Sequence, residues 1–228
     1  MIDKAVDHPP HVDMTQQEGR WNPDLAGDYD RIAKFYADAC ANDLGRAPLD
    51  QALLNRFAGL VHGPVCDLGC GPGHVTAYLR LRGAQAFGLD LSPRMIGQAR
   101  RRYPAVPFQV GDMRALDLRA GSLGGIVAFY SLIHLRRNRV VPVLRDMARV
   151  LGKNGRLLAG CHRGQQDLHA NERFGQPVSL DATLFEPAEL AGYATEAGFD
   201  VEETVMRRPY EFEVPLEKLY LFAVKRST

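Results

Sequence analysis

Residues 65–74 combine an acidic side chain with three glycines at alternating positions. The segment reads V-C-D-L-G-C-G-P-G-H, and Asp67 ends the apolar run that precedes Gly69, Gly71 and Gly73. Glycines let main-chain N–H groups approach a ligand with no Cβ in the way, and they adopt turn dihedrals that other residues resist. The segment therefore predicts a loop that binds a nucleoside cofactor against its backbone, rather than an ordinary tight turn.

The spacing of these glycines separates two cofactors. A dinucleotide loop follows G-x-G-x-x-G/A, where the last small residue lets the helix pack closely beside the pyrophosphate. His74 occupies that position in this chain. The D-x-G-x-G-x-G arrangement instead resembles motif I of class I S-adenosylmethionine-dependent methyltransferases. By this resemblance Gly69, Cys70, Gly71 and Gly73 belong to the cofactor-binding loop.

A second acid ends the next predicted strand. Asp90 follows Asp67 at close to the ~20-residue offset at which an acid reaches ribose hydroxyls in this architecture. Residues 88–92 (G-L-D-L-S) resemble the acidic-loop motif of the same family. The resemblance implies that Asp90 binds the ribose and that Leu91 and Met95 pack beside it. The alternative is an acid that ends a strand in water.

Asp112 and Met113 close the third predicted strand, and Gly111-Asp112-Met113 resembles the adenine motif of the family. There the carboxylate accepts a hydrogen bond from the exocyclic amine, and the next backbone N–H contacts the ring. Asp also caps neighbouring backbone readily, and the two interpretations are compatible.

The methionine end of the cofactor is assigned to Asp67 and Gly69, since a buried anion and exposed amides complement a zwitterion. Residues 27–33 (G-D-Y-D-R-I-A) resemble the Y-D-x-x-A start of many small-molecule methyltransferases. Tyr29 would then cover the cofactor, and an aromatic face suits a sulfonium. Its helix also needs residues for the hydrophobic core, so the alternative is that Tyr29 is a core residue with no contact to the cofactor.

Residues 128–135 (A-F-Y-S-L-I-H-L) follow the fourth predicted strand. Related methyltransferases place residues of this segment beside the transferring methyl group, so Tyr130 is expected in the cofactor site and His134 is the candidate general base. The alternative is a histidine that bonds backbone and shapes the pocket, since the sequence shows no partner carboxylate. The N-P-P-Y or D-P-P-Y signature of enzymes that methylate adenine or amide nitrogens is absent.

The acceptor side is expected from the N-terminal helices, a long connection over about 162–184, and residues 207–215. His162, His169, Tyr210, Glu211 and Glu213 could reach the pocket from these segments, but solvent-facing loop positions explain each as well. No roles are assigned to them.

Apolar periodicity predicts two amphipathic helices before the glycine loop, over about 25–40 and 49–60, and alternating strands and helices after it. Such alternation indicates an α/β fold with a doubly wound, mostly parallel sheet covered by helices on both faces. A last helix begins at Pro187, and two strands follow at about 199–206 and 217–225. The family resemblance implies a Rossmann-like, seven-stranded sheet with an antiparallel last strand and an N-terminal helical cap.

Composition limits the alternatives. The chain has 228 residues, 46% of them hydrophobic, and a net charge of +1. We expect a flexible tail over 1–22 and one methyltransferase domain over 23–228, made of a helical cap (24–60), a cofactor-binding core (61–162) and an acceptor-side loop with C-terminal strands (163–228). The near-neutral charge argues against a nucleic-acid partner. The longest apolar run, 123–135, is too short to span a bilayer.

The four cysteines lack C-x-x-C pairs, which favours reduced thiols, no metal site and a cytoplasmic protein. The sequence thus predicts a monomeric or homodimeric enzyme that moves a methyl group from S-adenosylmethionine to an oxygen or nitrogen, less readily a carbon, of a small metabolite. An NAD(P)-dependent oxidoreductase and a noncatalytic module that binds S-adenosylmethionine are the alternatives.

Overall fold

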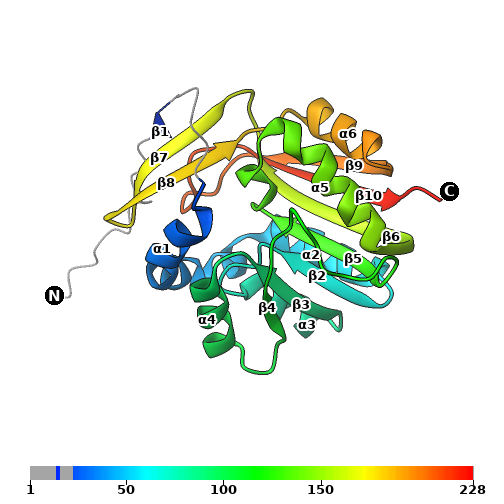
Figure 1. The fold of residues 1–228 in the computed structure, drawn as a ribbon, viewed down its shortest axis with the longest axis horizontal. Coiled ribbons are helices and arrows are strands. Elements are labelled where there is room, and N and C mark those ends of the chain that lie inside the picture. The colour runs from blue at the N-terminus through cyan, green and yellow to red at the C-terminus, as the bar shows by residue number, and fades with distance from the viewer. Residues whose placement is uncertain (1–13, 16–22, 228) are drawn as a thin grey trace.

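Seven strands form the main sheet of the protein, in the order β4-β3-β2-β5-β6-β10-β9 (Figure 1). The structure is a computed structural model, and it describes residues 14–15 and 23–227. The strands are β2 (Pro64–Leu68), β3 (Gln85–Asp90), β4 (Phe108–Val110), β5 (Leu123–Phe129), β6 (Leu151–His162), β9 (Phe199–Arg207) and β10 (Lys218–Lys225).

The sheet is mostly parallel, as the sequence predicts. Strands β4, β3, β2, β5 and β6 run parallel to one another, whereas β10 lies antiparallel between β6 and β9. In the parallel part, Asp67 of β2 pairs with Gly88 of β3 and Val127 of β5. The carboxyl ends of these strands therefore meet at one edge of the sheet, where open α/β sheets bind their ligands.

Helices cover both faces because successive strand residues point in opposite directions. Ile126 of β5 packs in a core with α5 and α6, whereas Val127 packs in a separate core with α2 and α3. The helices are α1 (Leu25–Ala39), α2 (Pro48–Leu60), α3 (His74–Leu81), α4 (Pro93–Arg102), α5 (Arg137–Val150) and α6 (Pro187–Glu196). Short 3₁₀ turns are η1 (Cys40–Asn42), η2 (Leu44–Arg46) and η3 (Leu132–His134).

Local sequence explains where several helices begin. The Ser92 hydroxyl accepts a hydrogen bond from the Met95 N–H at 3.0 Å, and Pro93 occupies the first turn of α4. Glu186 and Glu189 form a capping box at the start of α6. Helix α3 begins directly after Gly73, so its N-terminus opens on the glycine loop.

A β-hairpin occupies the segment for which sequence analysis predicted only a long connection. Strands β7 (Asp167–Arg173) and β8 (Gln176–Thr183) pair antiparallel, and β1 (Met14–Thr15) pairs with the other edge of β7. The turn residues Phe174 and Gly175 have φ of 55° and 69°, which is the geometry of a tight hairpin. Apolar residues at alternate positions on both sides of Gly175 carried this signal.

The hairpin lies beside α1, as Figure 1 shows. The Asp28 carboxylate accepts a hydrogen bond from the Ser179 N–H at 2.9 Å, and Arg31 Nη1 donates to the Pro177 carbonyl at 3.0 Å. Helix α1 and the hairpin together therefore enclose one end of the sheet. Apart from residues 14–15, the expected flexible tail lies outside the described residues.

Within the described residues, none of the helices is long and apolar enough to cross a membrane. The same part of the chain holds no group of three His, Cys, Asp or Glu side chains arranged to bind a metal ion.

Candidate active site

The glycine loop requires glycine at its turning points. Gly69, Gly71 and Gly73 have φ of 73°, 52° and 88°, in the left-handed region that favours glycine. A Cβ on Gly69 would lie 2.3 Å from Cβ of Ser131, and one on Gly73 would lie 2.5 Å from the Phe108 ring. The loop therefore turns sharply after β2 with no side chain at these three positions. The expectation of an exposed amide at Gly69 is wrong, because its N–H donates to the Leu89 carbonyl at 2.7 Å.

A cavity opens at this loop, and most of the predicted cofactor residues line it. They are Tyr29, Gly69, Gly71, Asp90, Leu91, Met95, Asp112, Met113 and Tyr130, together with the candidate base His134. Three predicted residues do not line this cavity. Gly73 is buried at the start of α3, while Asp67 and Cys70 line a separate cavity behind the loop.

Asp90 is held in place by backbone donors. Its carboxylate accepts hydrogen bonds from the N–H groups of Gly71 and Ser92, both at 2.8 Å. Burial raises the pKa of Asp90, and these N–H groups counteract that effect. The hydrogen bond from Gly71 connects the glycine loop directly to Asp90, the acid at the end of β3. The loop and the predicted ribose-binding acid therefore hold each other in place.

Asp112 makes the local contacts expected of a capping residue. Its carboxylate accepts from the Arg114 N–H at 2.8 Å and from Arg114 Nε at 2.9 Å. Burial alone would raise the pKa of Asp112, but the bonds from Arg114 hold it below the usual value. The carboxylate is thus fixed at the cavity wall beside Met113, and its adenine-binding role stays a prediction.

Asp67 lies behind the loop. It is 1% exposed, and its carboxylate accepts a hydrogen bond from the Thr76 hydroxyl at 2.6 Å. Burial raises the pKa of Asp67 to about 7. Its predicted contact with the methionine end of the cofactor would come through this separate cavity, which adjoins the main one at Gly69 and Gly71.

Tyr29 and His134 form a hydrogen-bonded pair between α1 and η3. The Tyr29 hydroxyl lies 2.6 Å from His134 Nε2, and His134 Nδ1 lies 2.8 Å from the main-chain carbonyl of Asp181. A carbonyl only accepts, so Nδ1 carries the proton and Nε2 accepts from Tyr29. Burial lowers the pKa of His134, which keeps the imidazole neutral. The ring is therefore oriented with a basic nitrogen in the cavity.

A second, larger cavity of about 620 Å³ meets the first at this pair. The two cavities share Tyr29, Tyr36, Tyr130 and His134. The larger one is enclosed by α1, the β7–β8 hairpin and residues 211–218. Of the residues for which sequence analysis left open a place in the pocket, His162, His169, Glu211 and Glu213 line this cavity, and Tyr210 does not.

Tyr210 instead fastens the loop that follows β9. Its hydroxyl accepts a hydrogen bond from the Leu49 N–H at 3.2 Å, and its own N–H donates to Glu213 at 2.8 Å. The aromatic ring also lies under the Arg207 guanidinium, 4.0 Å from it. These contacts hold residues 210–213 against α2, at the wall of the larger cavity.

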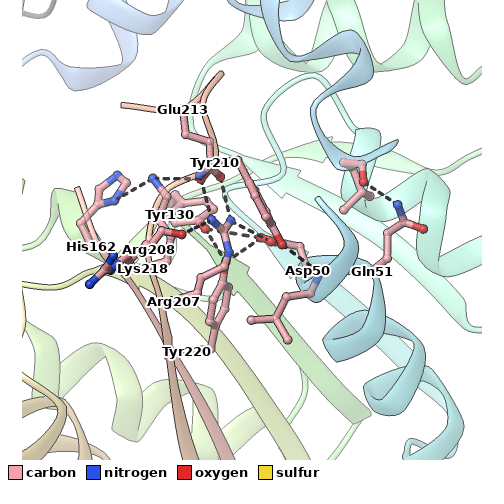
Figure 2. Close-up of polar contacts among 12 residues, drawn as sticks. Asp50, Gln51, Tyr130, His162, Arg207, Arg208, Tyr210, Glu213, Lys218 and Tyr220 are labelled. Carbon is pink, nitrogen blue, oxygen red and sulfur yellow. Dashed lines mark hydrogen bonds and ion pairs between the residues drawn. The ribbon is translucent and has the colours of Figure 1, made fainter. Parts of the chain in front are cut away.

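A buried polar network supports that wall (Figure 2). Arg207 donates to Asp50 at 2.8 Å and to both oxygens of Glu213 at 2.6 and 2.7 Å. The Tyr220 hydroxyl donates to Asp50 at 2.7 Å and lies 2.8 Å from the Tyr130 hydroxyl. The network therefore connects α2, β9, β10 and the cavity residue Tyr130, and sequence analysis missed its two central members, Asp50 and Arg207.

The comparisons with known proteins agree with this fold and loop. Residues 65–155 match the model of a methyltransferase domain family. Magnesium-protoporphyrin O-methyltransferase of Rhodobacter capsulatus is 35% identical over 46% of this chain and 49% of its own length. An uncharacterized methyltransferase of Synechocystis is 29% identical over 72% of this chain and 79% of its own.

A solved structure described as a SAM-dependent methyltransferase of Methanosarcina mazei has the same fold. The TM-score is 0.68 at 15% identity, over 75% of this chain and 97% of that one. The chain therefore contains a region that matches a methyltransferase domain, and it shares the fold of this solved methyltransferase structure. It spans about half the length of the Rhodobacter relative.

Proposed function

We propose that the protein transfers the methyl group of S-adenosylmethionine to an oxygen or nitrogen of a small metabolite, with oxygen favoured. The observation that carries this proposal is the Tyr29–His134 pair, which lies where the glycine-loop cavity meets the larger cavity. One cavity offers a place for the methyl donor and the other a place for the acceptor. The O-methyltransferase name of the Rhodobacter relative supports an oxygen acceptor.

The residues of the glycine-loop cavity fit the donor. Gly69 and Gly71 line it with no side chain that would fill it, and Asp90 presents a fixed carboxylate for a ribose diol. Tyr29, Tyr36 and Tyr130 add aromatic faces, which favour a sulfonium. Bound S-adenosylmethionine would supply an electrophilic methyl group on a good leaving group.

The protein's own part is to align the acceptor, exclude water and remove a proton. The neutral His134 imidazole accepts a hydrogen bond from Tyr29 at Nε2, so the proton of an acceptor hydroxyl would pass to the Tyr29 oxygen as the proton of Tyr29 passes to Nε2. The Asp181 carbonyl would then stabilise the imidazolium at Nδ1. We therefore propose His134 as the general base and Tyr29 as its partner.

We also propose that the enzyme acts in the cytoplasm, on free small molecules rather than nucleic acid, as a monomer or homodimer. The net charge of +1 and the four free thiols support the first two parts. Light scattering after gel filtration measures the third, and a larger assembly would contradict it.

Calorimetric titration with S-adenosylmethionine and with NAD tests the cofactor. Saturable NAD binding without S-adenosylmethionine binding would contradict the proposal and favour an oxidoreductase. Mass spectrometry of a metabolite extract incubated with methyl-labelled S-adenosylmethionine then tests transfer. A labelled small molecule is expected, whereas cofactor binding with no labelled product would point to a noncatalytic binding module.

A further inference from the structure

Arg173 is a cation that lines the larger cavity. It ends strand β7 at the tip of the hairpin and is partly buried. Its guanidinium lies over the Phe174 ring, 5.1 Å from the ring centre. With the residues that the structure describes it forms neither a hydrogen bond nor an ion pair.

Stacking occupies only the face of a guanidinium. Its five N–H donors lie in the plane and remain available for an acceptor. The stacking partner is itself held, because Phe174 packs edge-to-face on Tyr36 with ring centres 6.2 Å apart. Arg173 is therefore kept against the cavity wall with its donors unused.

Lys218 is a second cation of this cavity. It is 2% exposed, and Nζ lies 3.5 Å from His162 Nδ1 and 3.9 Å from Glu213, as Figure 2 shows. Glu213 already accepts from Arg207 through both oxygens and from the Tyr210 N–H. The charge of Lys218 is thus only partly compensated.

The two cations face the same space. Burial chiefly lowers the pKa of Lys218 to about 8, and the charge of Arg173 acts in the same direction. The pKa of His162 is also lowered, first by burial and then by the charges of Lys218 and Arg173 among others. Arg173 and Lys218 carry like charges and line the same cavity, so an anion bound between them would be stabilised.

The acidic residues around the cavity are engaged elsewhere or exposed. Asp181 accepts from His169 at 2.7 Å, and Glu213 is bound by Arg207. Asp43 interacts electrostatically with Arg46, and Glu211 is exposed to solvent. None of these carboxylates is bonded to Arg173.

We propose that the methyl acceptor carries a carboxylate that binds the Arg173 guanidinium, with Lys218 as the second cation. The planar fork of arginine matches a carboxylate through two parallel hydrogen bonds. The rings of Tyr36, Phe174 and Phe212 line the same cavity and suit an apolar or aromatic body. The substrate class is an aromatic or apolar carboxylic acid, and this inference rests on the proposed methyl transfer.

The charge of the acceptor is measurable before the acceptor is identified. A metabolite extract is split on a strong anion exchanger at pH 8, and each fraction is incubated with the enzyme and methyl-labelled S-adenosylmethionine. Label is expected in the retained fraction. Label only in the unretained fraction would overturn the carboxylate site while leaving methyl transfer intact, and label in neither would overturn both.

The residue is tested with the acceptor purified from the retained fraction. Arg173→Met should raise KM about 10- to 100-fold, because the variant loses hydrogen bonds to a charged group. Its kcat should stay within about twofold of the wild-type value. Arg173→Lys keeps the charge but not the fork and should fall between Arg173→Met and the wild type. The control is Arg119→Met, an exposed arginine outside the cavity, which should leave KM unchanged.

Binding of S-adenosylhomocysteine by calorimetry separates the two ligands. Its Kd should stay within about twofold in Arg173→Met, because Arg173 does not line the glycine-loop cavity. An unchanged KM in the well-folded Arg173→Met or Arg173→Lys protein would overturn the proposal. So would a loss of S-adenosylhomocysteine affinity in either variant, since the guanidinium would then serve the cofactor.

Discussion

The hydroxyl group of Tyr29 lies 2.6 Å from Nε2 of His134, although 105 positions separate the two residues in the chain. One comes from the N-terminal helix α1 and the other from the 3₁₀ turn that follows β5. The main-chain carbonyl of Asp181, on the hairpin, fixes the tautomer of the same imidazole. Three separate segments thus meet to present one basic nitrogen at the junction of two cavities.

Replacing His134 with Gln should lower kcat for a hydroxyl acceptor about 100-fold, because the amide neither accepts a proton nor stores its charge. The Kd for S-adenosylhomocysteine should stay within about twofold, because the substitution keeps a polar side chain of similar reach. Steady-state kinetics and calorimetry measure the two quantities.

Tyr29→Phe is the matched variant for this pair. It removes the hydroxyl that bonds Nε2 and keeps the ring that packs on Tyr36. A smaller fall in kcat is expected, about tenfold, if the base remains but its partner is lost. Wild-type turnover in His134→Gln would exclude the imidazole from the mechanism.

The pH dependence should report the neutral form of His134. Burial lowers the pKa of this imidazole, so the neutral base persists below the usual histidine value of about 6.5. The value of kcat/KM should therefore stay constant from pH 8 to about 6.5. It should then decrease as the pH falls through the lowered pKa of His134. Rates across pH 5 to 8 are the measurement.

Two other groups titrate near this window, because burial gives Asp67 a pKa of about 7 and Lys218 a pKa of about 8. The His134→Gln variant shows which group causes the fall in kcat/KM at low pH. Its remaining activity should no longer fall at low pH, and a fall that persists unchanged would assign it to another group.

Asp90→Ala should weaken cofactor binding at least tenfold. The substitution removes the carboxylate that accepts from Gly71 and Ser92 and, by our assignment, from the ribose. Calorimetry with S-adenosylhomocysteine measures the effect. Asp117→Asn, at an exposed position outside the cavity, is the control. A Kd for Asp90→Ala within twofold of the wild type would be inconsistent with the ribose assignment.

Asp50→Asn should destabilise the fold by about 3 kcal/mol, because it leaves the buried Arg207 guanidinium with one carboxylate instead of two. Urea unfolding gives the free energy of unfolding. The control is Asp200→Asn, which breaks the exposed ion pair with Arg226 and should cost less than about 1 kcal/mol. Similar losses in the two variants would contradict the structural role of the network.

The sequence predicts the parts of this molecule that local spacing determines. The glycine loop, Asp90 and the alternation of strands and helices around them follow from motifs in which neighbouring residues set the geometry. The link from Asp90 to Gly71 lies within that unit, and the fold class is confirmed with its antiparallel β10.

The sequence does not reveal what tertiary contacts bring together. The sequence shows no partner carboxylate for His134, because the group that orients the imidazole is a main-chain carbonyl, which no residue type signals. Arg173 reaches the cavity only because the β7–β8 hairpin folds against α1, a long-range contact that the expected connection over 162–184 does not predict. Asp50 and Arg207 pair across 157 positions of the chain.

A crystal structure of the protein with S-adenosylhomocysteine tests the central claim most directly. The account predicts the nucleoside in the glycine-loop cavity, with ribose hydroxyls within hydrogen-bond distance of Asp90 and the sulfur directed toward Tyr29 and His134. A ligand bound elsewhere, or a carboxylate of Asp90 that makes no contact with the ribose, would contradict it.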